Sequence, residues 1–410
     1  MKHLRLDDLK MVYLISLILL ITACSAKGTE AVAVQPTATE AVATEVIEVE
    51  PTATAPLPTE APTEELATAV PTEIPTDTPQ PTAVPTDTAV PIERFAVDGI
   101  LPLYSTEPVI EHGANGAWDR NLDIAAVLYH DGQFHAFLNR FPGWPTSSFG
   151  LSYHTSPDGV NWTTVSDDPV FSQADLPDQT HMPIGSSVHL EEDGTWVQYF
   201  FTWNKGAGRS VNQIGRATAP DPLGPWTADE EYVLQPGPQG SWDAMGVARP
   251  YVIKNEDGYV MYYAGKNGRE MIGMATSPDG INWTKHDDPT TTDKLYAESD
   301  PVFLPSNEGG KWDQRSVSDP HILKTADGWV MSYASTIGNG VRVGYAISED
   351  GIMWKRSDEP LQSFADVPNN TALWSTELVY QDGMYYLFGE VNTGQFSGIY
   401  VATQAGALIP

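Results

Sequence analysis

Short apolar stretches alternate with tight-turn sequences along the chain from residue 93 onward. In "VIKNEDGYVMYYA" (252–264), an Asp-Gly pair separates two segments rich in apolar and aromatic residues. Glycine accepts the positive φ that a hairpin turn requires, and short β-branched and aromatic segments bounded by turns are typical of strands. Each such stretch therefore predicts an apolar strand, a turn and an aromatic strand. Five stretches of this kind occur, with turn aspartates Asp131, Asp193, Asp257, Asp327 and Asp382.

A second family of turns interleaves with the first. "TSPDGVNW" (155–162), "TSPDGINW" (276–283) and "ISEDGIMW" (347–354) share the form Ser-x-Asp-Gly-x-x-Trp, and "GRATAPDPLGPW" (215–226) is a degenerate copy. We interpret each copy as a hairpin whose Trp packs into a core, and hence as scaffold. One unit is then two hairpins, or four strands, in about 64 residues.

Repeated four-stranded units without helical periodicity predict an all-β fold, a five-bladed β-propeller of four-stranded blades. The fifth unit stops after "SGIYVATQAG" (397–406) and lacks its last strand. The segment "GILPLYSTEPVI" (99–110) resembles the missing piece. We therefore expect an N-terminal strand to complete blade five and close the ring, which protects sheet edges.

The first 92 residues have a different composition. Residues 1–23 combine basic residues with an apolar run that is too short to span a bilayer, which is typical of a signal peptide. The run ends at Ala23-Cys24, which resembles a bacterial lipobox and implies cleavage before Cys24 and lipidation of its sulfur. An ordinary signal peptide or an uncleaved anchor is the alternative. Residues 24–92 are rich in Pro, Thr, Ala and Glu and predict a disordered tether.

Charge and cysteine content narrow the possible partners. The net charge is −32, which argues against nucleic-acid binding and leaves the lipid anchor as the expected membrane contact. Cys24 is the single cysteine, so the mature protein has no disulfide. We expect a monomer on the outer face of a bacterial cell membrane, with residues 93–410 as the propeller domain.

The innermost strands of a propeller converge on its axis, so equivalent positions on them face one another. Counting back eight residues from each Asp-Gly turn, with a shorter count in blade five, overlays five different residues. They are Asp123, Gly185, Arg249, Asp319 and Glu377. Scaffold positions repeat from blade to blade and these do not, which favours a binding or catalytic pocket. Each side chain could instead bond a neighbouring strand end.

Carboxylates on adjacent blades are suited to acid–base chemistry. Asp319, Glu377 and Asp123 belong to blades four, five and one, and like charges that are close push at least one pKa up. Paired carboxylates of this kind carry out glycoside hydrolysis. Arg249 could hold these carboxylates or a substrate group, and His321 is a further candidate for the pocket.

Aromatic residues could supply sugar-stacking faces, and we select Trp118 and Trp374 for this role. Trp118 belongs to a third repeat, Trp-Asp, which recurs at 242–243 and 312–313. Alternatively, this repeat is structural, and its aspartate caps a turn. The histidines lack metal-ligand spacing, and no phosphate loop, dinucleotide fingerprint or nucleophile elbow is present, so we predict no cofactor and no metal site of this kind. The sequence leaves open a structural cation at the centre of the propeller.

The blade pattern, "SDPHILKTADGWVMSYAS" (318–335) and "ATSPDGINW" (275–283) resemble the five-bladed glycosidases of families 43 and 32, over about residues 93–410. In family 43 a first-blade Asp is the general base, a second-blade Asp tunes pKa and a third-blade Glu is the general acid. Asp123 matches the first, while Gly185 and Ala248-Arg249-Pro250 depart from the others. The resemblance implies that the acid has moved to Glu377 or Asp319, or that the domain binds sugar without cleaving it.

Two functional hypotheses follow. The first is a surface-anchored glycoside hydrolase of oligo- or polysaccharides, with Asp123 as base or nucleophile, Glu377 as acid, and Asp319 as pKa modulator and substrate ligand. The second is a non-catalytic carbohydrate-binding propeller on the same anchor.

Overall fold

The computed structural model describes residues 101–406 apart from 144–145, 147, 180, 204–210, 326–327, 338–339 and 395. The predicted signal peptide, Cys24 and the tether lie outside the described residues. Among the residues described, no helix is long and apolar enough to cross a membrane.

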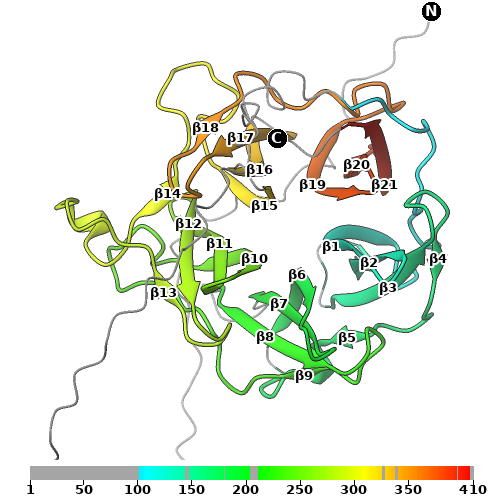
Figure 1. The fold of residues 1–410 in the computed structure, drawn as a ribbon, viewed down its shortest axis with the longest axis horizontal. Coiled ribbons are helices and arrows are strands. Elements are labelled where there is room, and N and C mark those ends of the chain that lie inside the picture. Colours follow the sequence, from blue (N-terminus) through cyan, green and yellow to red (C-terminus); the bar gives the residue numbers. More distant parts are fainter. Residues whose placement is uncertain are drawn as a thin grey trace, which may run out of the picture. The chain divides into compact units, whose positions relative to one another are not determined.

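Five antiparallel sheets form a ring, as the repeats predicted (Figure 1). Within each sheet the strands follow chain order from the axis outward. Blade one contains β1 (Asn121–His130), β2 (Gln133–Phe141), β3 (Gly150–Ser156) and β4 (Thr163–Thr164); blade two contains β6 (Met182–Leu190), β7 (Trp196–Trp203), β8 (Ile214–Ala219) and β9 (Thr227–Ala228). Blade three contains β10 (Val247–Asn255), β11 (Gly258–Asn267), β12 (Arg269–Ser277) and β13 (Thr284–Lys285); blade four contains β15 (Ser318–Thr325), β16 (Gly328–Ile337), β17 (Gly340–Ser348) and β18 (Lys355–Arg356). Blade five contains β19 (Ala372–Gln381), β20 (Met384–Asn392) and β21 (Ser397–Ala405).

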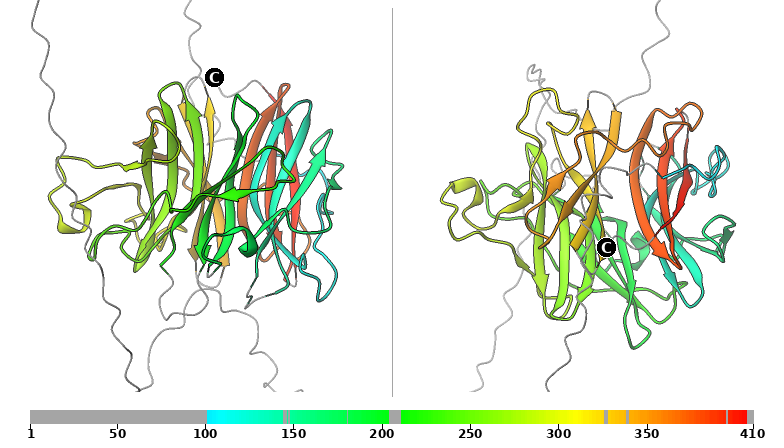
Figure 2. Two further views of the ribbon diagram at one scale, coloured as in Figure 1. Left: turned by 90° about the horizontal axis from the view of Figure 1, so that it is seen from below. Right: turned by 45° about the horizontal axis from the view of Figure 1, so that its top comes forward.

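Short additional elements decorate two blades. β5 (Phe171–Ser172) pairs with β3, and β14 (Pro301–Phe303) pairs with β12. The short 3-10 helices η1 (Gln173–Asp175) and η2 (Lys294–Tyr296) lie in the connections that follow blades one and three. Viewed from the side, the blades stand with their long strands roughly parallel to the axis of the ring (Figure 2).

The N-terminal segment completes blade five, as predicted. Leu103 forms an antiparallel bridge with Ala402, and Ile110 forms one with Ile399. The backbone amides of Tyr104 and Val109 donate to carbonyls of β21 at 2.9 and 2.7 Å. The fifth blade therefore takes its outer edge from the start of the domain, and the ring is closed by hydrogen bonds between its two ends.

The hydrophobic core lies between neighbouring blades. It consists of five clusters of buried side chains, and each cluster draws on two adjacent sheets. Phe137 and Trp196, for example, meet between blades one and two with ring centroids 5.8 Å apart. Burial of apolar area between sheets is the dominant favourable contribution to such a fold.

The repeated Ser-x-Asp-Gly-x-x-Trp turns have the structural role predicted for them. In "SPDGINW", the amides of Ile281 and Asn282 donate to Asp279 Oδ1 at 2.9 and 2.8 Å, and the Gly280 amide donates to Ser277 Oγ at 2.9 Å. The indole of Trp283 donates to the Gly280 carbonyl at 3.1 Å. Gly280 has φ +73°, which explains its glycine. The copies around Asp158 and Asp350 repeat these bonds.

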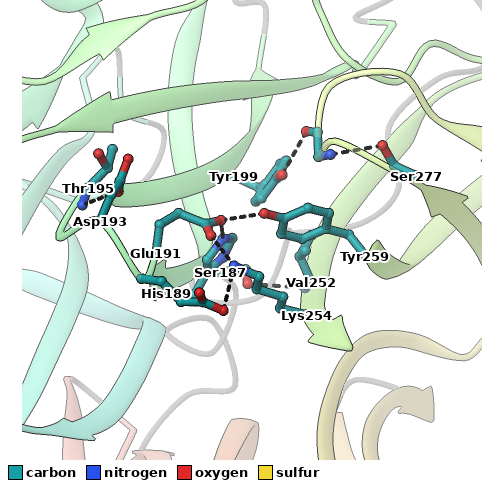
Figure 3. A network of polar contacts seen from close by, with 12 residues as sticks. Ser187, His189, Glu191, Asp193, Thr195, Tyr199, Val252, Lys254, Tyr259 and Ser277 are labelled. Atoms are coloured by element: carbon teal, nitrogen blue, oxygen red, sulfur yellow. Dashed lines mark hydrogen bonds and ion pairs between the residues drawn. The ribbon is translucent and has the colours of Figure 1, made fainter. Parts of the chain in front are cut away.

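In two of these turns, a tyrosine hydroxyl of the preceding blade donates a hydrogen bond to the carbonyl of the turn glycine. Tyr199 of β7 donates to the Gly280 carbonyl at 2.7 Å, and Tyr262 of β11 donates to the Gly351 carbonyl at 2.7 Å. Figure 3 shows the first of these bonds beside a polar network in which Glu191 accepts from Lys254 and Tyr259. The network joins blades two and three at the hairpin end of β6, away from the start of that strand.

The Trp-Asp repeat is also scaffold in blades three and four. The indoles of Trp242 and Trp312 are buried over Gly273 and Gly344 of the third strands. Asp243 and Asp313 are buried beside them and form ion pairs with Lys285 and Arg356 on the fourth strands. Each Trp-Asp pair thus connects the entry to a blade with the outer strands of that blade.

Candidate functional site at the axis

Every innermost strand carries a β-bulge near its start. The pairing register shifts around Ala125 in β1, Ser186 in β6, Arg249-Pro250 in β10, Asp319-Pro320 in β15, and Trp374-Ser375 in β19. A bulge adds a residue, bends the strand and redirects a side chain, and bulges are over-represented next to active sites. The residues overlaid from the sequence lie at or beside these bulges.

Arg249 and Asp319 have an uncommon backbone conformation. Their φ angles are +52° and +55°, in the left-handed region that residues with a Cβ rarely occupy. Both precede a proline within a bulge, so blades three and four share the same local backbone structure. Conformations of this kind persist where the surrounding structure enforces them, and they cluster at functional sites.

These two side chains form an ion pair across neighbouring blades. Arg249 Nη1 donates to Asp319 Oδ1 at 2.9 Å. The Arg249 side chain is 34% exposed, whereas that of Asp319 is 8% exposed. Burial lowers the pKa of Arg249, but the charges of Asp319 and Asp123 outweigh that effect and raise it. A permanent cation therefore stands at the axis with one side open to solvent.

A second layer lies two residues further along the strands. Tyr251, His321 and Glu377 each occur four residues before the last residue of β10, β15 and β19. Tyr251 donates its hydroxyl hydrogen to Glu377 Oε1 at 2.8 Å, and His321 Nδ1 lies 3.0 Å from Glu377 Oε2. Three blades thus meet on one buried carboxylate.

His321 links the two layers. Its Nδ1 contacts Glu377, and its Nε2 lies 3.9 Å from Asp319 Oδ1. Burial lowers the pKa of His321, but the attraction of Glu377 and the hydrogen bond to it, together with Asp319 and Asp123, raise it overall. A protonated imidazole between the two carboxylates fits both distances.

Asp123 is the half-buried carboxyl group of blade one in this cluster. Its pKa is raised, first by burial and then by the negative charge of Asp319, while Arg249 and His321 oppose the rise. A hydrogen bond with Glu390 also opposes it. Asp123 therefore holds its proton at a higher pH than an ordinary aspartate does.

The strand register corrects one equivalence drawn from the sequence. Glu377 does not stand level with Arg249 and Asp319, because it lies four residues before the end of its strand, as Tyr251 and His321 do in theirs. Both of its carboxylate oxygens are occupied by these two neighbours, and its exposure is only 2%. These contacts favour an orienting role for Glu377 over the proton-donor role expected from the sequence.

Gly185 has a structural reason to lack a carboxylate. Asn139 of β2 donates to the Gly185 carbonyl and accepts from the Gly185 amide, both at 2.8 Å. A Cβ at this position would lie 3.0 Å from Leu151 and 3.3 Å from Ala125. Where the family pattern has a second-blade aspartate, this chain therefore has a glycine that bonds Asn139 and joins blades one and two.

The two tryptophans selected from the sequence lie in different settings. Trp118 donates its indole N–H to the Asp167 carbonyl at 3.1 Å and packs against Gly150 of β3, which matches the scaffold position of Trp242. Trp374 is half-buried in the bulge of β19, at the start of an innermost strand. Of the two, Trp374 belongs with the axial residues, and a sugar-stacking role for either stays a prediction.

Glu390 is a member of the cluster that the sequence overlay missed. It lies on β20, a second strand, and the overlay compared only first strands. A buried glutamate within the apolar run "YYLFGEV" (385–391) was the available signal. Within the described ranges, no group of three or more His, Cys, Asp or Glu side chains is arranged to hold a metal ion.

Sequence comparisons relate this chain to uncharacterised proteins. No family model matches the chain. An uncharacterised protein of Mycobacterium tuberculosis strain H37Rv is 24% identical over 231 residues, which cover 53% of this chain and 71% of that protein. Its counterpart in strain CDC 1551 matches to the same extent.

The similar solved structures are five-bladed propellers of glycoside hydrolases. A structure from the GH130 family of mannoside phosphorylases, which contains hydrolases that target β-1,2-mannosidic linkages in Candida mannan, has a TM-score of 0.59 and 18% identity. It covers 81% of this chain and 100% of that one. A putative glycoside hydrolase of Parabacteroides distasonis has a TM-score of 0.58 and 20% identity, covering 75% and 97%. A glycosyl hydrolase of Bacteroides ovatus has a TM-score of 0.58 and 19% identity, covering 76% and 96%.

Proposed function

We propose that this protein is a glycoside hydrolase whose acid–base chemistry takes place at the propeller axis. The observation that carries the proposal is the meeting of Asp123, Arg249 and Asp319, from three blades, at the starts of the innermost strands, where the Arg249 side chain is 34% exposed. The fold that this chain shares with the glycoside hydrolases named above supports glycoside hydrolysis as the reaction. The finer likeness to families 43 and 32 is part of this proposal.

Asp123 is the residue to which we assign proton donation. Its raised pKa suits a general acid, because such a carboxyl group remains protonated when an ordinary aspartate has ionised. The proton passes from Asp123 to the glycosidic oxygen as the bond between that oxygen and the anomeric carbon breaks. This assignment reverses the base role that the family resemblance implied for Asp123.

Asp319 is the carboxylate to which we assign water activation. Water adds to the anomeric carbon and gives its proton to Asp319, which Arg249 holds in place through the bond to Oδ1. Glu377 fits this role less well, because Tyr251 and His321 occupy both of its oxygens. Arg249 retains exposed donors for a sugar hydroxyl, and Trp374 remains the candidate stacking surface.

A non-catalytic sugar-binding propeller is the second candidate. The observation in its favour is that Asp319 and Glu377 are both engaged by protein partners, as in a site that is built for stability. Under either candidate we propose that Cys24 is lipidated and that the tether holds the domain at the outer face of the membrane. Cell fractionation tests the anchor, since Cys24→Ala should move the protein from the membrane to the soluble fraction.

The experiment that tests the reaction is an assay of the full-length protein with arabinan, xylan, fructan and mannan oligosaccharides, with and without inorganic phosphate. We expect reducing-sugar release that does not require phosphate, and a loss of about 10²–10⁴-fold in kcat/KM for Asp123→Asn. Asp131→Asn is the matched control, because Asp131 is exposed in the turn of the same hairpin and its φ of +47° suits Asn.

Each alternative has its own result. If the product is a sugar phosphate, the protein is a phosphorylase and the proposed hydrolysis is wrong. A thermal shift with one sugar and no cleavage would support the binding protein. Equal activity of Asp123→Asn and Asp131→Asn would remove Asp123 from the mechanism.

A further inference from the structure

Glu390 is a carboxyl group buried beneath the axial cluster. It is 5% exposed, and its β20 neighbours Phe388 and Val391 belong to the apolar core. Ser375 Oγ donates to Glu390 Oε2 at 3.4 Å. β20 contacts β1 of the next blade, and Asp123 there is close enough to Glu390 to share a hydrogen bond with it. A buried carboxyl group with this many partners has a defined position.

The equivalent residue of blade one shows that this position is built to reach the next blade. Asn139 and Glu390 are each the seventh residue of their second strands, β2 and β20. Asn139 bonds both backbone groups of Gly185 on the innermost strand of blade two. Glu390 likewise points to the innermost strand of the next blade, where its partner is the side chain of Asp123. A scaffold contact in one blade is thus a contact to the candidate acid in another.

We propose that Glu390 is a positioning residue that stays protonated and donates its hydrogen bond to Asp123, holding that side chain toward the substrate. This inference rests on the function proposed above. It adds to the site a residue from the second strand of blade five, a position that neither the family resemblance nor the comparison of first strands contains.

The charges around the pair support this proton distribution. Burial raises the pKa of Glu390 well above its ordinary value, and the negative charges of Asp123 and Asp319 raise it further. The nearby Ser397 hydroxyl group opposes the rise in pKa. On the other side of Asp123 stand Arg249 of β10 and His321 of β15, which favour its ionised form. Of the two carboxyl groups, Glu390 is therefore the one that keeps its proton longer.

The first test compares Glu390→Gln with Glu390→Met in the full-length protein. Glutamine keeps a neutral donor for Asp123, whereas methionine removes the hydrogen bond that lowers the Asp123 pKa. Activity that needs protonated Asp123 falls as pH rises through that pKa. We expect the alkaline limb of kcat/KM to stay in place in Glu390→Gln and to move to higher pH in Glu390→Met. A limb that moves in the glutamine variant, or in neither variant, would overturn the proposal.

The second test needs no activity. A carboxyl group whose folded pKa is raised stabilises the fold most below its unfolded pKa, about 4.3, and that contribution is lost as pH rises through the folded value. Wild-type Tm should therefore fall relative to Glu390→Gln as pH rises from about 4 to 8. Glu192→Gln is the control, because the Glu192 side chain is 93% exposed and its substitution should leave the pH dependence of Tm unchanged.

The two tests separate the two levels of the argument. A Tm difference that does not vary with pH would overturn the role of Glu390 even if the enzyme is active. A pH-dependent difference in a protein without activity on any sugar would support the protonated Glu390 contact and overturn the proposed reaction.

Discussion

The outer turns and the axial bulges of this propeller differ in how far their residues repeat. The turns of blades one, three and four use Ser, Asp, Gly and Trp at the same places and make the same bonds. The five innermost strands share a bulge, yet the residues in or beside it are an aspartate, a glycine, an arginine, a second aspartate and a tryptophan. Where the backbone alone must be satisfied, one solution serves several blades. Where side chains must meet one substrate, five blades supply different groups.

The same contrast applies to buried charge. Asp243 and Asp313 are scaffold aspartates, each paired with a cation of its own blade. Arg249 and Asp319 are also paired, but the pair crosses two blades and leaves the arginine 34% exposed. A closed pair within a blade stabilises the fold, whereas an open pair between blades can exchange partners with a ligand.

The largest effect that should separate the two regions is a loss of stability in Trp242→Ala. Trp242 is fully buried, donates to Ser299 Oγ at 3.1 Å and covers Gly265 and Gly273. Truncation of such a side chain costs about 3–5 kcal/mol in the free energy of unfolding. Urea denaturation should show this loss, while kcat/KM of the protein that remains folded should be unchanged.

Trp118→Ala is the companion variant, because Trp118 holds the matching place in blade one but is half-buried. We expect a smaller loss of stability and an unchanged KM. If KM rises sharply while the free energy of unfolding stays at the wild-type value, Trp118 belongs to the substrate site and the scaffold reading of this repeat fails in blade one.

A pair of tyrosines gives an intermediate effect with the same chemical change. Tyr199→Phe removes the bond to the Gly280 carbonyl at an outer turn, and Tyr251→Phe removes the bond to Glu377 at the axis. The neutral bond is worth about 1 kcal/mol and the bond to a charged acceptor about 1.5–3 kcal/mol. Only Tyr251→Phe should also lower kcat/KM. The expected loss is about tenfold, which corresponds to about 1.4 kcal/mol of the bond's free energy acting on the transition state. Equal kcat/KM in the two variants would count against a functional second layer.

The fold could be predicted closely because its signals are local and repeated. Asp-Gly turns, alternating apolar segments and the displaced strand at 99–110 each depend on neighbouring residues, and the structure confirms the five blades and the closure of the ring. The turn reading of Asp158, Asp279 and Asp350 was confirmed for the same reason.

The site was less predictable because it depends on register. A count of eight residues back from each turn placed Asp123, Arg249 and Asp319 near one another. In blade five the same count leads from Asp382 to Trp374 in the bulge, whereas the shorter count selected Glu377, which lies level with Tyr251 and His321. Glu390 was missed because its function depends on which second-strand position reaches the next blade. That rule becomes visible only through the contact between Asn139 and Gly185.

The smallest expected effect comes from changing the one Ser-x-Asp-Gly-x-x-Trp turn whose sixth residue differs from that of the other two. Asn161 and Asn282 donate their side-chain amides to Asp158 and Asp279 at 2.7 Å, whereas Met353 holds the corresponding place beside Asp350 and is 75% exposed. Met353→Asn should restore this bond and raise the free energy of unfolding by about 0.5–1 kcal/mol, the usual net value of such a bond. Thermal unfolding measures the gain, and Met353→Ala controls for removal of an exposed apolar side chain. If the asparagine and alanine variants have the same Tm, the third bond of the turn contributes nothing, and the repetition of asparagine in blades one and three has a cause other than stability.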